Sequence, residues 1–488
     1  MQATTVITII IAYFAVLIVI SYFTGKNANN ATFFLGNRQS PWYIVAFGMI
    51  SASLSGVTLI SVPGWVMDSQ FSYMQIVLGY LLGYAVIAHI LMPMYYRLNL
   101  TSIYTYLEKR FGNVSYKTGA SFFLLSRLIG AAFRLFLVAN VLQISLFKQW
   151  GIPFEATVAV TILLIWLYTF KGGIRTIIWT DALQTLFMLI AVGVTIYLIS
   201  KDLNLNLGDM TKTIADSKHS KIFFFGNING QYHFIKQFLS GAFIAIVMTG
   251  LDQDMMQKNL SCRNIKEAQK NMHWFSLSLI PVNLLFMSLG ALLIIYAQTE
   301  GIPLPDQSDD LYPIIATQGY LSPLVGIFFI FGLISAAYSS ADSALTALTT
   351  SFTVDILNTK EMEEIPLRRL RKRVHIGISI LLALIIIIFN AVNDQSVISA
   401  VFTMAGYTYG PLLGLYTFGL FTKYRVKDKW VPAVAVLSPV ICGIVSFNSE
   451  AWFNGYKFGF ELLILNGLIT LIGLFILRNR KDAIQEKI

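Results

Sequence analysis

The stretch "FGMISASLSGVTLISVPGWV", residues 47–66, is apolar enough to enter a membrane, yet it holds glycines, serines, a threonine and a proline within one span. Glycine and proline are the weakest helix formers, so a continuous helix is disfavoured here. The pattern predicts a break near the middle of the membrane, where unwound backbone exposes carbonyl oxygens that can hold Na⁺. A helix that is kinked but continuous is the alternative.

The composition indicates a membrane protein. Of the 488 residues, 56% are hydrophobic and 12% are charged, whereas soluble domains carry about 25% charged residues. Apolar runs of roughly 20 residues, the length that crosses a hydrocarbon core of about 30 Å, recur thirteen times. They lie at approximately 4–25, 42–67, 71–96, 118–147, 151–170, 175–200, 234–258, 273–298, 320–352, 374–392, 396–421, 430–447 and 458–477. These runs predict an all-α polytopic protein with about 13 transmembrane helices.

The positive charge is distributed unevenly between the two sides of this arrangement. Of the 35 Lys and Arg residues, 26 fall in loops on one side, including "RRLRKR" (368–373), and seven fall on the other. Basic loops favour the cytoplasmic side. The sequence therefore predicts a multi-pass protein of the plasma (inner) membrane with its N-terminus outside and its C-terminus in the cytoplasm. The same placement argues against a nucleic-acid partner, since the lipid bilayer explains the basic loops.

Ionisable side chains inside the predicted spans are functional candidates because they are costly to bury in lipid. The main ones are Arg127, Arg134, Asp181, the pair Asp252 and Asp254, and Asp342. The pair lies near the C-terminal end of a predicted helix, where a negative charge is unfavourable without a partner. We therefore interpret the pair as a gate or structural contact, with ion binding as the alternative.

The stretch "SAAYSSADSALTAL" (335–348) places an acid and several hydroxyl groups inside an apolar helix. Residues three and four apart share a helix face, so Ser339, Asp342 and Ser343 form one patch. Several oxygen ligands close together suit a hard cation. Close packing through small residues is the alternative, but packing does not explain the carboxylate.

Four motifs occur in an order that resembles a known family. They are "GGIRTIIWTDALQT" (172–185), "TGLDQDMMQK" (249–258), "AAYSSADSALTALTTSFTVDI" (336–356) and "YGPLLGLYTFGLF" (409–421). Together they resemble the sodium/solute symporter family, which includes sodium–glucose, proline, pantothenate and sialic acid transporters. The resemblance covers essentially the whole chain.

This resemblance implies a five-plus-five inverted-repeat core, shared with the bacterial leucine transporter. The implied division is an extra N-terminal helix and loop (1–40), a first repeat (41–200), an extracytoplasmic loop (201–233), a second repeat (234–422), and two peripheral helices with a short tail (423–488).

The resemblance also implies where Na⁺ binds. The widespread sodium site would use the backbone carbonyls of Ser51, Leu54 and Ala336 and the hydroxyls of Ser339 and Ser340. A second sodium, present in some members, would use Asp181, Ser339, Asp342 and Ser343. The compared members have Ser or Thr where this chain has Asp342. The number of sodium ions bound per cycle, one or two, therefore stays open.

The resemblance further implies that the solute lies at mid-membrane, outside the sodium layer. The matching positions are Ser53, Ser55, Thr58, Tyr73, Gln75, Arg127 and Arg134. Sialic acid members bind the substrate carboxylate with an arginine in this part of the helix, although a gapless alignment places Gly130 there. A buried guanidinium suits a carboxylate, and a salt bridge to a buried aspartate is the alternative for both arginines.

The predicted function is sodium-coupled secondary active symport, in which a small organic solute is imported by alternating access. An anionic sugar acid such as sialic acid, or another carboxylate, is the favoured solute, and a neutral sugar or polyol is the alternative. A channel or a membrane sensor is a more distant alternative. An enzyme is not expected, because the five histidines form no metal-spaced cluster and no Ser/His/Asp grouping. We expect Na⁺ to be the required ion and the protein to act as a monomer.

Overall fold

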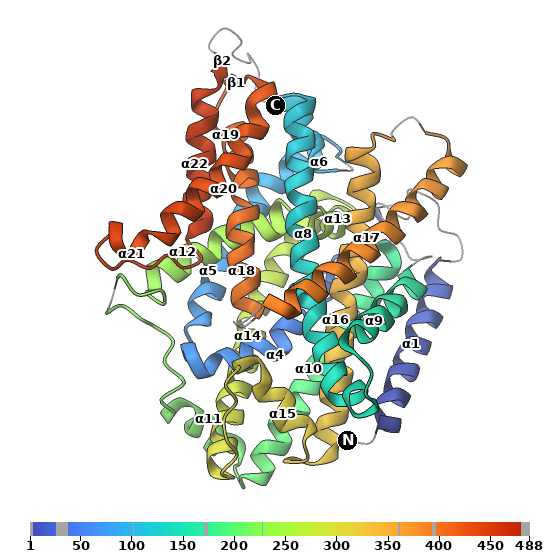
Figure 1. Ribbon diagram of the computed structural model, residues 1–488, viewed down its shortest axis with the longest axis vertical. Helices are drawn as coiled ribbons and strands as arrows, with labels where there is room; N and C mark the ends of the chain where they lie inside the picture. The colour runs from blue at the N-terminus through green and yellow to red at the C-terminus, as the bar shows by residue number, and fades with distance from the viewer. Residues whose placement is uncertain are drawn as a thin grey trace.

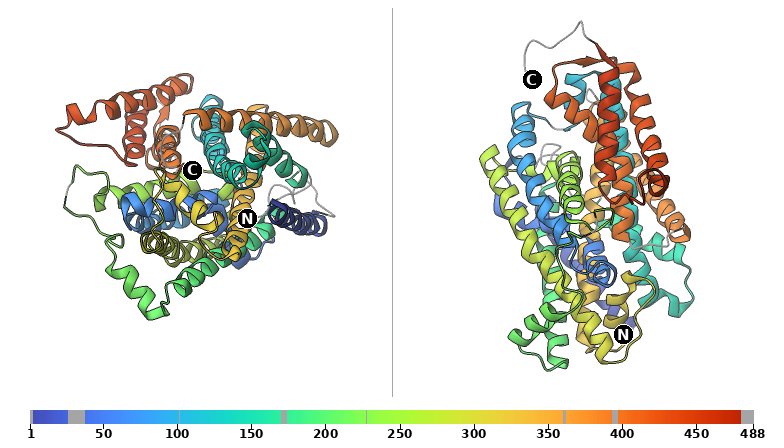
Figure 2. Two further views of the ribbon diagram at one scale, coloured as in Figure 1. Left: turned by 60° about the horizontal axis from the view of Figure 1, so that its bottom comes forward. Right: turned by 90° about the vertical axis from the view of Figure 1, so that its left-hand side faces the viewer.

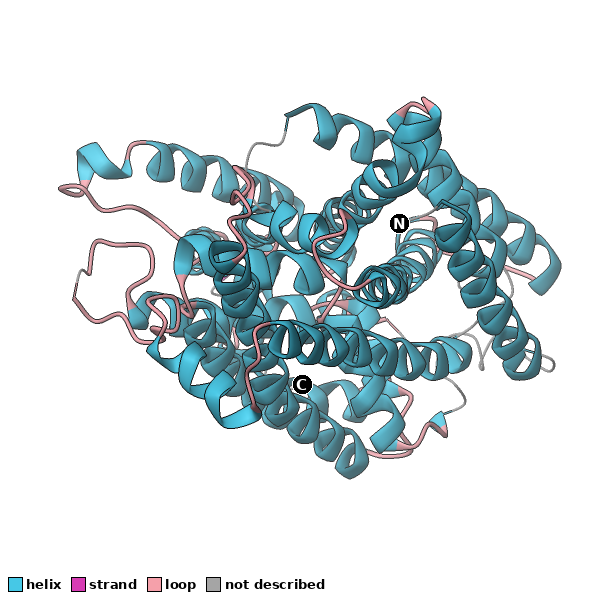
Figure 3. Cartoon of the chain, turned by 90° about the horizontal axis from the view of Figure 1, so that it is seen from below, coloured by secondary structure: helices cyan, strands magenta, loops and turns pink. Residues whose placement is uncertain are grey.

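The structure, a computed structural model, describes residues 3–25, 38–100, 102–169, 174–226, 228–359, 362–392 and 397–479. Most of these residues are helical (Figure 3). The strands among them, β1 (Arg425–Val426) and β2 (Arg478–Asn479), pair antiparallel at one end of the bundle, the upper end in Figure 1. We call this the β1–β2 end, and the opposite end the α15 end.

The helices follow the predicted spans. Those of the first half are α1 (Ala3–Gly25), α3 (Trp42–Ser53), α4 (Gly56–Ser69), α5 (Tyr73–Val86), η2 (Ile87–Leu91), α6 (Met92–Arg97), α7 (Thr105–Arg110), α8 (Asn113–Leu142), η3 (Gln143–Phe147), η4 (Lys148–Trp150), α9 (Phe154–Thr169), α10 (Ile174–Asp202) and α11 (Leu207–Asp216). Those of the second half are α12 (Phe234–Ala245), η5 (Ile246–Gly250), α13 (Gln253–Leu260), α14 (Ile265–Thr299), η6 (Ser308–Asp310), α15 (Leu311–Thr317), α16 (Pro323–Ser351), η7 (Phe352–Ile356), α17 (Glu364–Val392), α18 (Val397–Thr408), α19 (Gly410–Phe421), η8 (Asp428–Trp430), α20 (Val431–Phe447), α21 (Ser449–Trp452) and α22 (Leu462–Ile476).

The helical membrane class is confirmed by the length and composition of these elements. Seven helices in the described ranges are long and apolar enough to cross a membrane, or up to nine if each of two bent pairs is one span. Shorter apolar helices lie at the other predicted spans, at Ile11–Ile20, Phe154–Trp166, Val397–Thr408, Gly410–Phe421 and Leu462–Ile476. The number thirteen stays a prediction.

The two bent pairs come at the start of the two predicted repeats. The α3–α4 pair bends by 57°, and the pair formed by α12–η5 and α13 bends by 68°. The first bend confirms the break predicted in residues 47–66. The residue boundaries proposed for the repeats stay predictions.

Close helix crossings hold the core together. An added Cβ at Gly79 of α5 would lie 2.0 Å from the carbonyl oxygen of Phe238, and one at Gly241 of α12 would lie 2.1 Å from that of Ile76. Glycines on both helices thus let the two backbones touch, as small residues do between membrane helices. This contact fixes α12, and with it the bend into α13, against α5.

The additional helices lie around this core. In Figure 2, α1 lies on one side of the bundle and α20, α21 and α22 lie on the opposite side. Helix α22 packs on α18 and α19, and its Asn466 donates hydrogen bonds to the carbonyl oxygens of Gly406 and Tyr407 at 2.9 and 2.8 Å. These carbonyls lie just before Tyr409, where α18 gives way to α19.

Candidate sodium and solute site

The break between α3 and α4 exposes backbone oxygens. Helix α3 ends at Ser53, and Leu54 and Ser55 leave the helical region with ψ values of 85° and −176°. The last carbonyls of a helix have no partner within it, so those of the final turn of α3 are available to other groups. This is the feature that the composition of residues 47–66 predicts.

Helix α10 anchors the broken end of α3. The Ser51 hydroxyl donates to the carbonyl oxygens of Gly48 at 3.0 Å and Asp181 at 2.9 Å. The Ser51 amide donates to Thr185 Oγ1 at 3.0 Å, and that hydroxyl donates to the Phe47 carbonyl at 2.9 Å. An added Cβ at Gly48 would lie 3.1 Å from the Ile178 carbonyl oxygen, so the glycine permits this close packing.

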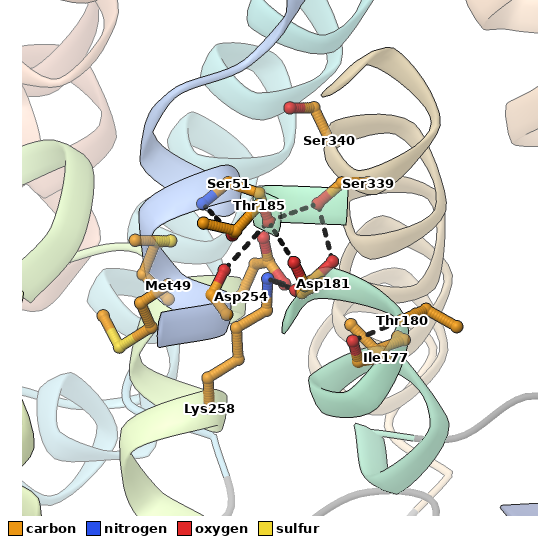
Figure 4. Close-up of polar contacts among 12 residues, drawn as sticks. Met49, Ser51, Ile177, Thr180, Asp181, Thr185, Asp254, Lys258, Ser339 and Ser340 are labelled. Atoms are coloured by element: carbon orange, nitrogen blue, oxygen red, sulfur yellow. Dashed lines mark hydrogen bonds and ion pairs between the residues drawn. The ribbon is translucent and has the colours of Figure 1, made fainter. Parts of the chain in front are cut away.

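Helix α16 completes the cluster from the other side. The hydroxyl oxygens of Ser51 and Ser339 are 3.2 Å apart, and Ser339 donates to Asp181 Oδ1 at 2.6 Å (Figure 4). The three side chains are fully buried. We call Ser51, Ser339 and Asp181 the hydroxyl–carboxylate cluster.

The remaining residues of the predicted widespread sodium site lie at the end of α3 and on α16. Leu54, Ala336 and Ser340 are all buried, and the Ser340 hydroxyl is 3.4 Å from the Ala336 carbonyl oxygen. Figure 4 places Ser340 on α16 apart from the hydrogen bonds of Asp181. The predicted ligands are hydroxyl and carbonyl oxygens, which are the donors that a hard cation prefers, so this set fits Na⁺.

The predicted second sodium set is only partly brought together by the residues that the structure describes. Asp181 and Ser339 are in contact, and Ser343 is buried on α16. Asp342 lies on α16, but its side chain is outside the described part of the chain.

The Asp181 carboxylate is paired with a lysine that the sequence analysis did not single out. Lys258 of α13 donates from Nζ to Asp181 Oδ2 at 2.8 Å, and both side chains are 1% exposed. The only hint in the sequence is that "GLDQDMMQK" ends in a lysine, while its two acids indicate a basic partner.

Those two acids also pair with an arginine. Arg127 forms an ion pair with Asp254 and lies 3.7 Å from Asp252. Asp252 accepts a hydrogen bond from the Tyr409 hydroxyl at 2.9 Å and caps α13 by accepting from the amides of Asp254 and Met255. The pair thus joins α8, α13 and the α18–α19 junction, and for Arg127 the salt-bridge alternative describes the observed contact.

A cavity of about 70 Å³ lies beside the break. The predicted solute residues that line it are Ser53, Ser55, Thr58, Tyr73, Arg127 and Arg134. Sequence reasoning missed Asn283 of α14, which also lines it. The Asn283 side-chain oxygen is buried without a hydrogen-bond partner in the described structure. Nothing in the sequence around Asn283 distinguishes it from the other asparagines of the chain.

Arg134 differs from Arg127 in its surroundings. It lines both this cavity and a smaller one that also includes Gly130. No carboxylate of the described residues forms an ion pair with it. An added Cβ at Gly130 would meet no atom within 4 Å, so the space beside Arg134 is open.

Gln75 does not line the cavity. Its side-chain amide donates to the Tyr232 carbonyl at 3.0 Å and accepts from the Phe224 amide at 3.1 Å. The predicted solute contact is not seen in this structure, where the glutamine is committed to the loop before α12, which supplies both partners.

On the α15 side of the cavity, a loop carboxylate caps α18. Asp309 Oδ2 accepts from the Val397 amide at 2.8 Å. The loop approaches α4 so closely that an added Cβ at Gly64 would lie 2.1 Å from the Ser308 carbonyl oxygen. Burial raises the pKa of Asp309 to about 6, although the bond from Val397 opposes the shift.

Comparison with known proteins assigns this architecture. The profile of the sodium:solute symporter family matches residues 33–429. The chain belongs to the sodium:solute symporter family. The resemblance carried by the four motifs is therefore confirmed.

Relatives within this family share about a quarter of their residues with the chain. The sodium-dependent multivitamin transporter of Oryctolagus cuniculus is 26% identical over 407 residues, which are 79% of this chain but 61% of the relative, less than two thirds of its length. The sodium/sialic acid symporter of Proteus mirabilis is 23% identical over 93% of this chain and 92% of the relative.

A solved structure supports the fold. A Na⁺-coupled sialic acid symporter in a substrate-bound, outward-open state superimposes with a TM-score of 0.80, at 20% identity, over 97% of both chains. The likeness confirms the inverted-repeat transporter fold of this family member.

Proposed function

We propose that the protein is a sodium-coupled symporter that imports a small carboxylate solute by alternating access. The observation that carries the choice of solute is Arg134, a guanidinium that lines the central cavity and forms no ion pair with the described side chains. A cation held in an apolar interior requires compensation. Arg127 has it from Asp254, whereas for Arg134 the solute supplies it.

The chemistry of the cavity matches such a solute. A guanidinium offers parallel donors to both oxygens of a carboxylate. The hydroxyls of Ser53, Thr58 and Tyr73 and the amide of Asn283 line the same space. A carboxylate with hydroxyl or amide substituents, as in a sugar acid, would use both kinds of group.

Sodium binding is coupled to the helix arrangement through the hydroxyl–carboxylate cluster. The proposed ion contacts the break of α3–α4 on one side and Ser339 and Ser340 of α16 on the other. It would therefore hold α16 against the broken helix, and residues at that break also line the solute cavity. Contacts that can close the two routes lie on either side of it: Arg127 with Asp254 towards α13, and Asp309 with Val397 at the α15 end.

Orientation, location and assembly complete the proposal. The basic segment 423–429 lies at the β1–β2 end, which we place in the cytoplasm with the C-terminus. The N-terminus is then outside a plasma (inner) membrane. One chain contains both the sodium and the solute residues, so we propose that it acts as a monomer and carries its solute without changing it chemically.

A neutral sugar or polyol is the second candidate. The hydroxyl-bearing and amide side chains around the cavity favour it, but it would leave the Arg134 charge unbalanced.

Purified protein in proteoliposomes distinguishes the two candidates. Sodium-dependent uptake is measured for a radiolabelled sialic acid, a short monocarboxylate, a hexose and a polyol. We expect Na⁺-driven uptake of a carboxylate and none of the neutral compounds. Na⁺-driven uptake of the hexose or polyol, without any carboxylate, would establish the second candidate instead.

A further inference from the structure

Both carboxylate oxygens of Asp181 are engaged in the structure. Ser339 donates to Oδ1 at 2.6 Å, and Lys258 donates to Oδ2 at 2.8 Å. The ammonium and the carboxylate are both 1% exposed, and Figure 4 shows that they face each other. A cation of the chain itself therefore lies where the second sodium set requires a carboxylate oxygen.

We propose that Lys258 is the built-in counter-cation of Asp181, that its ammonium takes the place of a second sodium, and that the protein binds one Na⁺ per transport cycle. This proposal rests on the proposed sodium-coupled function and specifies its stoichiometry.

Electrostatics favours the ammonium over a free ion at this position. Two cations on one buried carboxylate repel each other strongly in a medium of low dielectric constant. Lys258 is attached to α13, so its local concentration at Asp181 is far higher than that of an ion drawn from solution. A second Na⁺ would have to displace it and leave a buried ammonium without its partner, which is strongly unfavourable.

The same arrangement prepares the first sodium site. Because the Ser339 hydroxyl donates its proton to Asp181, the lone pairs of its oxygen remain available on the side of Ser51, 3.2 Å away. Lys258 keeps Asp181 fixed and charge-balanced while it orients Ser339. The lysine is thus a positioning residue for one sodium and a substitute for another.

Lys258 also links the cluster to the second ion pair. Its Nζ lies 4.0 Å from Asp254 Oδ1, and Asp254 pairs with Arg127. The lysine belongs to α13, directly after the 68° bend. Lys258 therefore connects the hydroxyl–carboxylate cluster to the contact between α8 and α13.

The test counts the sodium ions bound by purified full-length protein, with ²²Na⁺ alone as the probe and no solute present. We expect one Na⁺ per wild-type chain. Lys258→Gln removes the tethered charge and exposes Asp181, so we expect two Na⁺ per chain. Lys258→Arg keeps a cation and should bind one. The double variant Asp181→Asn/Lys258→Gln lacks the carboxylate and should also bind one.

Two Na⁺ per wild-type chain would overturn the proposal, as would one Na⁺ per chain in folded Lys258→Gln. If Lys258→Gln does not fold, the count for the wild type still decides, since one ion supports the proposal and two contradict it. Binding of no Na⁺ by the folded wild type would contradict the sodium-coupled function itself. That result differs from a count of two Na⁺ per chain, which would contradict only the proposed stoichiometry.

Discussion

The hydroxyl oxygens of Ser51 and Ser339 lie 3.2 Å apart where the broken helix α3–α4 meets α16. The two residues are 288 positions apart in the chain, and each also contacts Asp181, Ser51 through the backbone carbonyl and Ser339 through the carboxylate. This junction is where we place the driving ion.

Removing two hydroxyls from α16 tests that placement. In Ser339→Ala/Ser340→Ala two oxygen ligands are lost, while the small side chains still pack. We expect Na⁺-driven uptake to fall at least about 100-fold, the effect of about 3 kcal/mol in binding, with folded protein retained as judged by size-exclusion chromatography. Ser335→Ala, a buried serine of the same helix outside the predicted set, is the matched control. Unchanged sodium dependence in the double variant would exclude these serines as ligands.

The two arginines of α8 should fail in different ways. Arg134→Gln removes the charge proposed to bind the solute, so we expect loss of solute binding with little loss of thermal stability. Arg127→Gln removes the close ion pair of the buried Asp254 and leaves it only the more distant Lys258. Breaking a buried pair costs about 3–5 kcal/mol, so we expect this variant to lose thermal stability. Solute binding and thermal unfolding are both measured in detergent.

A double variant provides the control for the arginine pair. Arg127→Gln/Asp254→Asn removes both charges and should recover much of the stability lost in the single variant. Wild-type binding of an anionic solute by folded Arg134→Gln would exclude this arginine as its partner.

The raised pKa of Asp309 predicts that the stability of the protein depends on pH. Its pKa is about 6 in the folded protein and about 3.9 in an unfolded chain, so the folded state holds the proton more tightly. The stabilisation is fully present below about pH 4 and is lost as the pH rises through about 6. Asp309→Asn stays neutral and can still accept from Val397, so it should be more stable than the wild type at pH 8, by up to about 3 kcal/mol, and no more stable at pH 4.

Thermal unfolding of both proteins between pH 4 and pH 8 measures this difference. Asp306→Asn, an exposed position of the same loop, is the control. Parallel pH profiles for the wild type and Asp309→Asn would rule out the buried carboxylate as the source.

The contact between α5 and α12 predicts a steric effect. In Gly241→Ala the new methyl group would lie 2.1 Å from the Ile76 carbonyl oxygen, so the helices must separate. We expect stability to fall by more than about 2 kcal/mol, within the range for overpacked cores. Gly193→Ala on α10 meets no atom within 4 Å and should be neutral or slightly stabilising. Equal thermal stability of the two variants would contradict the close crossing.

The sequence was informative where the signal is local. The break after α3 follows from glycines, serines and a proline within one span, and the shared face of Ser339 and Ser343 follows from helix geometry. The pairing of Lys258 with Asp181 joins residues 77 positions apart, and only the packing of α13 against α3 and α10 brings them together.

Gln75 illustrates the limit of such reasoning. Its position one helix after the break suggested a solute contact, but a glutamine can satisfy either a ligand or a backbone. The loop before α12 supplies a carbonyl and an amide that use both ends of its side chain. Residue type and approximate depth do not distinguish these two uses.

A sodium gradient is proposed to drive the accumulation of a carboxylate solute. The most direct measurement is the steady-state ratio of radiolabelled carboxylate inside and outside proteoliposomes, at a series of imposed Na⁺ gradients with proton and potassium gradients collapsed. Sodium coupling predicts that the ratio rises with the Na⁺ gradient and returns to one when the gradient is removed. Accumulation that persists without a Na⁺ gradient, or that follows an imposed proton gradient instead, would contradict it.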